Sequence, residues 1–323
     1  MRRARQTLIS LALLAVLPAP SSLAQTVQKL ETDAPVQRVI ETGDGALVYA
    51  GERYQAIVPC SDPIGLCVVP ATAPTGPKPA PANGLPDGEI ATAPSGDISR
   101  AWYARPTNRY AHGVLGDAIE AGSLVVATQD GRELELILPE AQVFEDITPR
   151  IADLDGNGTN EIITLRASRT GGGGVAIYGL ADGDLRELAA GSENGRPNRW
   201  LNIAGLVPRP DGGFTIYGVR TPHIGGRLFA LNFRDGAVSE RNDIALDLSN
   251  HVIGSRELDL SAVGEFGGRT ELVLPSQDRR RLRFPLSDRA DIALPGPIDR
   301  AIALVDGQIV TATGSGDLLV IRP

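Results

Sequence analysis

The chain has 323 residues and a formal net charge of −8 at pH 7, with 37 glycines, 24 prolines and only 4% aromatic residues. An acidic surface repels phosphate backbones and anionic lipid, so the charge excludes nucleic acid as the natural partner. Apolar residues show no 3.6-residue period over any long stretch, which excludes a mainly helical fold.

The first 24 residues have the layout of a secretory signal peptide. Arg2, Arg3 and Arg5 precede an apolar run over Leu8–Leu17, and cleavage is expected after Ala24. The run is about half of the ~20 residues that a membrane helix needs, so no membrane insertion is expected. We therefore expect a mature protein that is periplasmic or secreted.

The expected domain plan has three parts after the signal peptide. Residues 25–58 should supply N-terminal strands, residues 59–97 a proline-rich loop, and residues 98–323 the main body. Nine of the 24 prolines fall within the loop, which has too few bulky apolar residues to build a sheet. Cys60 and Cys67 are the only cysteines, and in an exported chain they are expected to form a disulfide that pins this loop.

Short apolar runs follow one another along the chain and are expected to be strands. They are rich in Val, Ile and Leu, and Gly- and Asp-containing turn signals bracket most of them. The runs are Ala46–Ala50, Leu124–Thr128, Leu134–Leu138, Glu161–Leu165, Val175–Tyr178, Phe214–Val219, Leu228–Phe233, Glu271–Leu274, Ile302–Leu304, Ile309–Thr313 and Leu318–Ile321.

A weak repeat is superimposed on these runs. Each repeat has a small or apolar pair, then an acidic or glycine-rich turn, then a strand, at intervals of about 40 to 60 residues. The repeats lie at 113–128, 149–165, 201–219, 259–275 and 300–313. This spacing fits a four-stranded propeller blade, so we predict an all-β fold, a β-propeller of about six or seven blades. An early segment, 37–51, resembles the last repeat, which predicts that the N- and C-terminal strands meet to close the ring.

Residues 151–163 read IADLDGNGTNEII and carry the most specific signal in the sequence. Calcium takes six to eight oxygen ligands, and alternate positions of a tight glycine-containing loop can supply them. The candidate metal ligands are Asp153, Asp155, Asn157, Thr159 through its backbone carbonyl, and Glu161. Position twelve is Thr164, inside the next apolar run, which argues against an EF-hand. The alternative is a turn that binds nothing, because Asp, Asn and Gly favour turns in any case.

This motif resembles the D-x-D-x-[DN]-G-x-x-[DE] calcium loops of FG-GAP or VCBS-type repeats, which occur in integrin-like β-propellers. The flanking Ile151, Ile162 and Ile163 fit the strands of such a blade. The resemblance implies a calcium ion held between two strands of one blade. Weaker cognates at 116–126 and 264–274 lack the alternating oxygen set, and the phenylalanine-glycine signature is absent, which leaves the blade boundaries open.

Further candidates lie in the segment 101–117, which is dense in aromatic and polar residues. Its members could line the mouth of a propeller channel, where Arg109 or His112 would bind an acidic group or transfer a proton. Alternatively, the rings are core residues and Arg109 pairs with Asp117 or Glu120. His223 and His251, beside turn signals, could converge with His112, although satisfied structural histidines are the commoner case.

The leading hypothesis for function is an exported, calcium-stabilised propeller that acts as a binding or scaffold module for a protein or glycan partner. The alternative is a periplasmic hydrolase or lyase with its site in the propeller channel. Common hydrolase, nucleotide, redox and zincin motifs are absent from the sequence. The enzymatic alternative predicts that several of Arg109, His112, His223 and His251 converge in a cleft.

Overall fold

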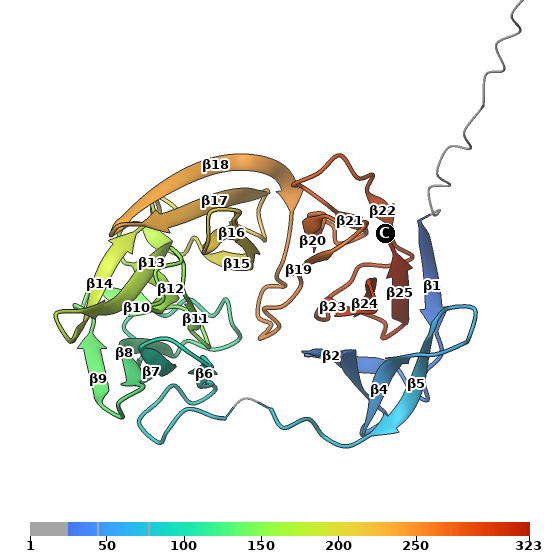
Figure 1. The fold of residues 1–323 in the computed structure, drawn as a ribbon, viewed down its shortest axis with the longest axis horizontal. Helices are drawn as coiled ribbons and strands as arrows, with labels where there is room; N and C mark the ends of the chain where they lie inside the picture. The colour runs from blue at the N-terminus through green and yellow to red at the C-terminus, as the bar shows by residue number, and fades with distance from the viewer. Residues whose placement is uncertain (1–24, 44, 77) are drawn as a thin grey trace, which may run out of the picture.

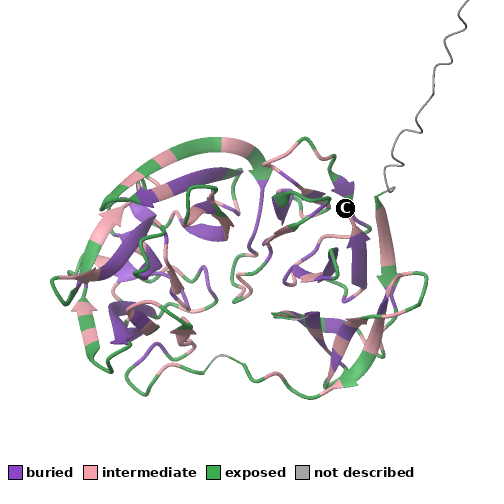
Figure 2. Ribbon diagram, in the orientation of Figure 1, coloured by how far each residue is buried: buried purple, intermediate pink, exposed green. Residues whose placement is uncertain are grey.

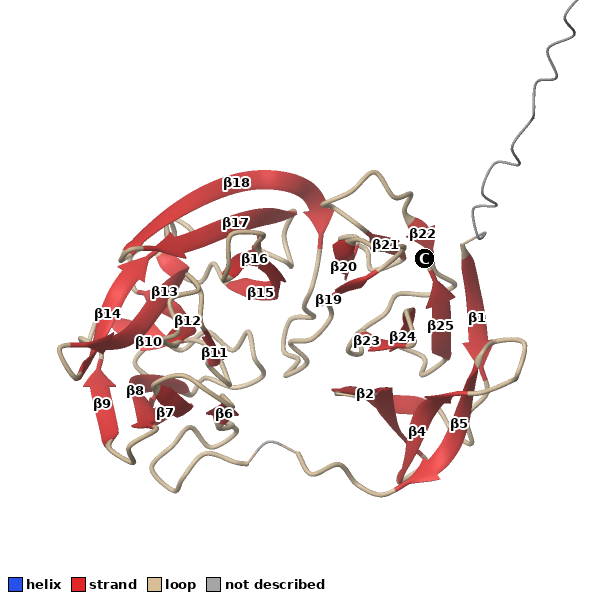
Figure 3. Ribbon diagram, in the orientation of Figure 1, coloured by secondary structure: helices blue, strands red, loops and turns tan. Residues whose placement is uncertain are grey.

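The computed structural model of the protein describes residues 25–43, 45–76 and 78–323 (Figure 1). The expected signal peptide lies outside the described residues. The regular structure within the described ranges is β-strand, which confirms the all-β prediction (Figure 3). No segment of these ranges forms a helix with the length and apolar character of a membrane span.

Three four-stranded antiparallel sheets have their strands in sequence order, as in a meander. Group 1 comprises β2 (Val36–Thr42), β3 (Gly45–Ala50), β4 (Arg53–Pro59) and β5 (Leu66–Ala71). Group 4 comprises β15 (Leu201–Pro208), β16 (Phe214–Arg220), β17 (Gly226–Arg234) and β18 (Ala237–Leu248). Group 5 comprises β19 (Ala262–Glu265), β20 (Thr270–Pro275), β21 (Arg281–Arg283) and β22 (Ile292–Ala293).

A nine-stranded sheet contains two further groups. Group 2 comprises β6 (Ala91–Thr92), β7 (Ile98–Thr107), β8 (Glu120–Thr128) and β9 (Glu133–Ile137). Group 3 comprises β10 (Gln142–Phe144), β11 (Arg150–Ala152), β12 (Glu161–Ser168), β13 (Gly172–Ala181) and β14 (Asp184–Ala190). The two groups join where Phe144 of β10 pairs with Ala121 of β8, while β10 and β11 both pair with β12.

The two ends of the described chain meet in one sheet. Group 6 has the order β1 (Thr26–Leu30), β25 (Leu318–Arg322), β24 (Gln308–Ala312) and β23 (Ala303–Val305). Thr26 pairs with Arg322 and Leu30 with Leu318 in an antiparallel register. The N-terminal strand therefore completes a sheet whose other strands come from the C-terminus, as the sequence predicted, although closure of a full ring stays a prediction.

The hydrophobic core lies between successive sheets. Separate buried clusters join groups 2 and 3, 3 and 4, 4 and 5, 5 and 6, and 6 and 1. Among the described residues, no such cluster joins group 1 to group 2. There the chain between β5 and β6 packs Ala80 and Ile90 against Trp102 and Val125 of group 2, and Figure 1 shows it running between the two groups.

Burial differs sharply between the strands within each group. Strands β8, β12, β13 and β24 are buried over most of their length. In the outer strands β9 and β18, by contrast, exposed residues are interspersed with partly buried ones (Figure 2). Strand β18 carries charged side chains at three of its exposed positions, Arg241, Asp243 and Asp247, and charged edge strands discourage pairing with other chains. Every apolar run singled out in the sequence lies in or overlaps a strand.

Two strands, β5 and β6, fall inside the segment that the sequence suggested as loop. Strand β5 lies within 59–97 and pairs with β4 so that Val58 faces Cys67. The disulfide between Cys60 and Cys67 is present, with 5.8 Å between the Cα atoms. Because this bond joins the end of β4 to β5, it pins a hairpin, while the proline-rich remainder continues to β6.

We expect the variant Cys60→Ala/Cys67→Ala to be less stable to unfolding by about 2.5 kcal/mol. Cross-linking a loop of this length lowers the entropy of the unfolded chain, and this raises the free energy of the unfolded chain by roughly that amount. Urea denaturation of the two proteins measures the difference. A matched fall on adding a thiol reductant to the native protein, and none in the variant, would attribute it to the disulfide.

Candidate functional site

The acidic motif found in the sequence connects β11 to β12 as a tight loop. Gly156 and Gly158 have φ angles of 79° and 91°, a region that residues with a Cβ atom rarely adopt. A Cβ atom at Gly156 would also lie 3.1 Å from the backbone nitrogen of Gly213 in the β15–β16 turn. The two glycines therefore allow both the sharp reversal and the close approach to group 4.

Three carboxylates of this loop converge. Asp153, Asp155 and Glu161 each offer an oxygen, and these oxygens all lie within 4.8 Å of one another. Asp153 also organises the loop, because its Oδ1 accepts hydrogen bonds from the backbone N–H groups of Gly156 and Asn157 at 2.8 and 3.0 Å. The loop thus holds its carboxylates towards a common point.

The other two predicted ligands, Asn157 and Thr159, are hydrogen-bonded to each other within the loop. Asn157 Oδ1 accepts hydrogen bonds from the backbone N–H and the hydroxyl of Thr159, at 2.7 and 2.6 Å. The amide oxygen of Asn157 is therefore engaged within the loop. The structure brings together the carboxylates of Asp153, Asp155 and Glu161. Asn157 and Thr159 also shape the turn, and ligation by the Asn157 amide oxygen and the Thr159 carbonyl stays a prediction.

The donor set fits a hard divalent cation. Calcium–oxygen distances of about 2.3–2.6 Å place ligands on opposite sides of one ion about 5 Å apart, which matches the spread of the three oxygens. Burial, together with the nearby charges of Asp155 and Asp153, raises the pKa of Glu161 to about 7. A bound cation would offset both effects.

The loop is hydrogen-bonded to the groups on either side. Asn160 donates its backbone N–H to Asp97 Oδ1 at 2.7 Å, and its side chain donates to the carbonyls of Ser95 and Ile98 in group 2. On the other side, the backbone N–H of Phe214 in group 4 donates to the Leu154 carbonyl at 3.0 Å. Ordering this loop would therefore stabilise three consecutive groups.

Arg109 of the segment 101–117 is structural. Arg109 donates from Nε to the Gln142 carbonyl at 2.9 Å, and its nearest carboxylate is Glu140, at 3.6 Å. The expected pairing with Asp117 or Glu120 is therefore wrong, because the guanidinium caps backbone carbonyls at the β9–β10 turn. Asp117 pairs instead with Arg256, at 2.6 Å.

The three histidines of the chain gather around Trp200. His223 Nε2 and His251 Nδ1 are 2.7 Å apart, and both rings contact the indole, with centroid distances of 6.0 and 4.6 Å. The indole N–H donates to the Glu145 carbonyl at 2.9 Å, and the Glu145 carboxylate contacts His112 Nδ1. His112 comes from the β7–β8 connection, and His223 from the β16–β17 turn.

Sequence reasoning missed the acidic members of this region. Burial and the neighbouring Glu145 raise the pKa of Glu120 to about 10. Glu145 is itself buried, and its Oε2 has no hydrogen-bond partner among the described residues. The only sequence signal was the pair Glu145-Asp146 between apolar residues at the end of β10.

We expect the protein to lose stability as the pH falls from about 7 to about 4. Burial lowers the pKa of both His223 and His251 to about 4. Between that pH and the ordinary imidazole value, the unfolded chain binds protons that the folded one does not, so acid favours unfolding. Urea denaturation at both pH values should show a smaller loss in His223→Gln/His251→Gln. An equal loss in the variant would contradict this assignment.

A hollow lies where residues of four groups meet. A cavity of about 250 Å³ is lined by Glu41 from group 1, Arg150 from group 3, residues 203–206 from group 4, and Asp259 before group 5. Burial raises the pKa of Glu41, with a smaller contribution from Asp259. The hollow is polar and combines both signs of charge.

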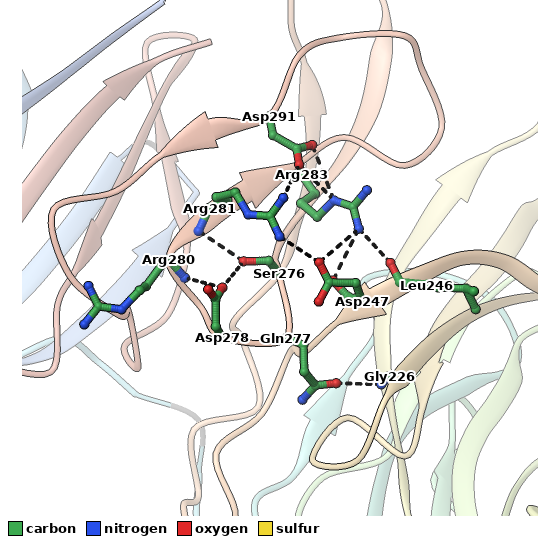
Figure 4. Close-up of polar contacts among 10 residues, drawn as sticks. All are labelled: Gly226, Leu246, Asp247, Ser276, Gln277, Asp278, Arg280, Arg281, Arg283 and Asp291. Carbon is green, nitrogen blue, oxygen red and sulfur yellow. Dashed lines mark hydrogen bonds and ion pairs between the residues drawn. The ribbon is translucent and has the colours of Figure 1, made fainter.

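Two of the four arginines in the turn at 276–284, Arg281 and Arg283, are paired with acids. Figure 4 shows Arg281 between Asp247 of β18 and Asp291, at 2.8 and 3.2 Å, and Arg283 beside the same two carboxylates. Arg283 also donates to the Leu246 carbonyl at 2.6 Å. These contacts tie the outer edge of group 4 to group 5, so this turn does not present a free basic patch.

Comparison with protein-family models and with curated proteins gave no match. Among solved structures, the chain is similar to the exotype rhamnogalacturonan lyase YesX, at 14% identity over 91% of this chain and 66% of that chain, with a TM-score of 0.45. It thus spans just under two thirds of the lyase's length. A protein from Lactobacillus plantarum is similar at 13% identity over 88% and 80% of the two chains, with a TM-score of 0.37. BamB from Moraxella catarrhalis is similar at 10% identity over 93% and 98%, with a TM-score of 0.31.

Proposed function

We propose that the chain is a six-bladed β-propeller and that each of the six groups is one blade. Support comes from the meander order of the strands and from the cores shared by neighbouring groups. The pairing of β1 with β25 would join the chain ends within the last blade, as closed propellers require. The segment between β5 and β6 would span the remaining junction, between groups 1 and 2.

This propeller binds one calcium ion in the loop 153–161, as in the FG-GAP or VCBS-type repeats that the motif resembles. The observation that carries the proposal is the convergence of Asp153, Asp155 and Glu161 in a loop hydrogen-bonded to both neighbouring blades. The ion would neutralise part of this charge and so stabilise the junction of three blades. Exported proteins meet calcium concentrations that fill even weak sites.

The biological role that follows is an exported, calcium-stabilised binding or scaffold module, acting on a protein or glycan partner in the periplasm or outside the cell. Rigid sheets would hold the connecting loops of several blades at fixed positions on one face. Such loops commonly carry recognition on a stable scaffold.

Isothermal titration with Ca²⁺ tests the metal assignment. We expect one ion per chain, weaker binding of Mg²⁺, and no detectable binding in Asp155→Ala. Magnesium demands a stricter octahedron at shorter distances than this set of converging carboxylates provides. The control Asp130→Ala removes a carboxylate from the β8–β9 turn, outside the cluster, and should bind calcium as the native chain does. If the native chain did not bind Ca²⁺, the metal assignment would be wrong.

The enzymatic alternative is favoured by one observation, the gathering of His112, His223 and His251 around Trp200. Arg109 does not join them, because it is engaged with backbone carbonyls. A periplasmic hydrolase or lyase would place its chemistry at these imidazoles.

A further inference from the structure

The hollow where residues of four groups meet has an apolar wall. Its volume is about 250 Å³, which is below the ~300–1,000 Å³ of sites for drug-sized molecules and suits a smaller ligand. The apolar wall consists of the partly buried Leu206 of β15, Leu258 of the β18–β19 connection and Val263 of β19. A Cβ atom at Gly205 would lie 2.4 Å from Val263 Cγ2. Strands β15 and β19 therefore pack directly against each other and close the hollow on this side.

Arg150 of β11 supplies the positive charge of the hollow. Its Nη1 donates to Asp146 Oδ2 at 2.6 Å and to the Thr148 carbonyl at 3.2 Å, which fixes the guanidinium in place. The Nε and Nη2 atoms make no hydrogen bond within the described part of the chain, and neither is among its enclosed unpaired atoms. These two N–H groups form one edge of the guanidinium, so they are available to a carboxylate, which such an edge binds with two parallel hydrogen bonds.

Two carboxylates, from Glu41 of β2 and Asp259 of the β18–β19 connection, supply the negative charge of the hollow. Within the described ranges Asp259 makes hydrogen bonds only through its backbone, so its carboxylate is free. Burial, with a further contribution from the charge of Asp259, raises the pKa of Glu41, Glu89 and Glu257. Arg38 offsets part of this effect at Glu89 and Glu257. The carboxylates thus lie close enough to disfavour one another's charge, and a cationic group between Glu41 and Asp259 would relieve this.

The opposite charges of the hollow face each other without forming an ion pair. Against the effect of burial, the pKa of Arg150 is raised by charges that include Asp146 and Asp259, so Asp259 acts on the guanidinium. Among the described residues, however, the carboxylate that lies within 4.0 Å of Arg150 is that of Asp146. A space therefore separates the free edge of Arg150 from the free carboxylate of Asp259. A ligand that carries both charges would bridge it.

We propose that the hollow binds a free α-amino acid with an aliphatic side chain, in its zwitterionic form. The ligand carboxylate accepts hydrogen bonds from Nε and Nη2 of Arg150. The ligand ammonium lies between Glu41 and Asp259, and the aliphatic side chain packs against the apolar wall. An ion of a single sign would leave one end of the hollow without a partner. This ligand goes beyond the protein or glycan partner proposed above, and its recognition does not depend on the calcium ion.

Isothermal titration of the native chain with a series of small molecules tests the ligand class. L-leucine carries both charges and an aliphatic side chain. L-leucinamide lacks the carboxylate, N-acetyl-L-leucine lacks the ammonium, and D-glucose lacks both charges. At about pH 7 we expect one L-leucine per chain and no detectable binding of D-glucose. Both leucine derivatives should bind at least about 10-fold more weakly than L-leucine, because each leaves a charged group of the hollow without its partner.

The variant Asp259→Asn tests the ammonium end of the site. The substitution keeps the size of the side chain and removes its charge, and L-leucine should bind at least about 10-fold more weakly. N-acetyl-L-leucine is an anion, so it should bind the variant at least as well as the native chain, because a repelling carboxylate has been removed. Asp130→Asn removes an exposed charge from the β8–β9 turn, outside the hollow, and should bind L-leucine as the native chain does.

Equal affinities for L-leucine and its two derivatives would overturn the proposal, because neither charge would then be recognised. Absence of L-leucine binding, or binding of D-glucose in its place, would overturn it as well. The ligand series uses the native chain alone, so it decides the proposal even if Asp259→Asn did not fold, which near-ultraviolet circular dichroism would show. Calcium titration of the native chain keeps the two proposals apart, since failure of L-leucine to bind would leave calcium binding at residues 153–161 unchanged.

Discussion

Replacement of Asp155 by alanine is expected to abolish the effect of calcium on thermal stability. At a free concentration of about 100 times Kd, one bound ion stabilises the native protein by about 2.7 kcal/mol. For a chain of this size that corresponds to a rise in Tm of about 5–10 °C. Asp155 is the suitable position, because its carboxylate accepts one backbone hydrogen bond within the loop, from Asn157 at 3.2 Å, whereas Asp153 accepts three.

Four melting curves measure this effect, from the native chain and Asp155→Ala, each with calcium and with chelator. The native chain should melt higher in calcium, and the variant should melt at one temperature in both. Asp130→Ala, in the β8–β9 turn, should retain the full calcium response whatever its own stability. Identical native curves in calcium and chelator would contradict a stabilising ion.

Arg150→Ala is expected to destabilise the fold by about 3 kcal/mol at pH 7. Arg150 donates to Asp146 Oδ2 at 2.6 Å, and Asp146 is fully buried. Tyr103 donates its hydroxyl to the same oxygen at 3.3 Å. Removing the arginine leaves a buried carboxylate without its counter-charge, and breaking buried pairs in this way costs several kcal/mol.

The loss should be smaller at pH 5 than at pH 7. Burial already raises the pKa of Asp146, and removal of the positive charge of Arg150 would raise it further. A carboxyl whose folded pKa is raised loses stability as the pH rises through that value, so acid relieves the defect. Urea denaturation at both pH values measures the difference. Arg132→Ala breaks an exposed pair with Asp130 and should change the stability little at either pH. An equal loss in both variants would contradict the buried-pair account.

The strands were predictable because their signals are local. Runs such as Glu161–Leu165 and Leu228–Phe233 are apolar, β-branched and bounded by turns, and each lies inside a strand. Four of the five repeat segments cover the first hairpin of a group, from β11–β12 to β23–β24. The repeats in the sequence thus correspond to hairpins that recur in the structure. The exceptions in the proline-rich segment were β5 and β6. Strand β5 is short, contains Pro70 and is held by its pairing with β4 and by a disulfide, and β6 has only two residues.

The acidic loop was predictable in outline for the same reason. Its carboxylates converge because they alternate along one short turn, and Gly156 and Gly158 permit that turn. The predicted ligand oxygen of Asn157 also accepts hydrogen bonds from Thr159, so its place among the ligands stays a prediction. Competition between a ligand and a neighbouring hydroxyl is decided by the loop's own geometry, which spacing alone does not specify.

The sequence by itself determined the strands, the disulfide partners and the acidic loop, because in each case the interacting groups are close neighbours along the chain. Only the tertiary structure decided that His112, Trp200, His223 and His251 share one region and that Arg109 does not. These side chains come from the connections of different groups, separated by up to 139 positions. Their meeting depends on how whole sheets pack against one another, and packing of that kind leaves no periodic or local trace in the order of the residues.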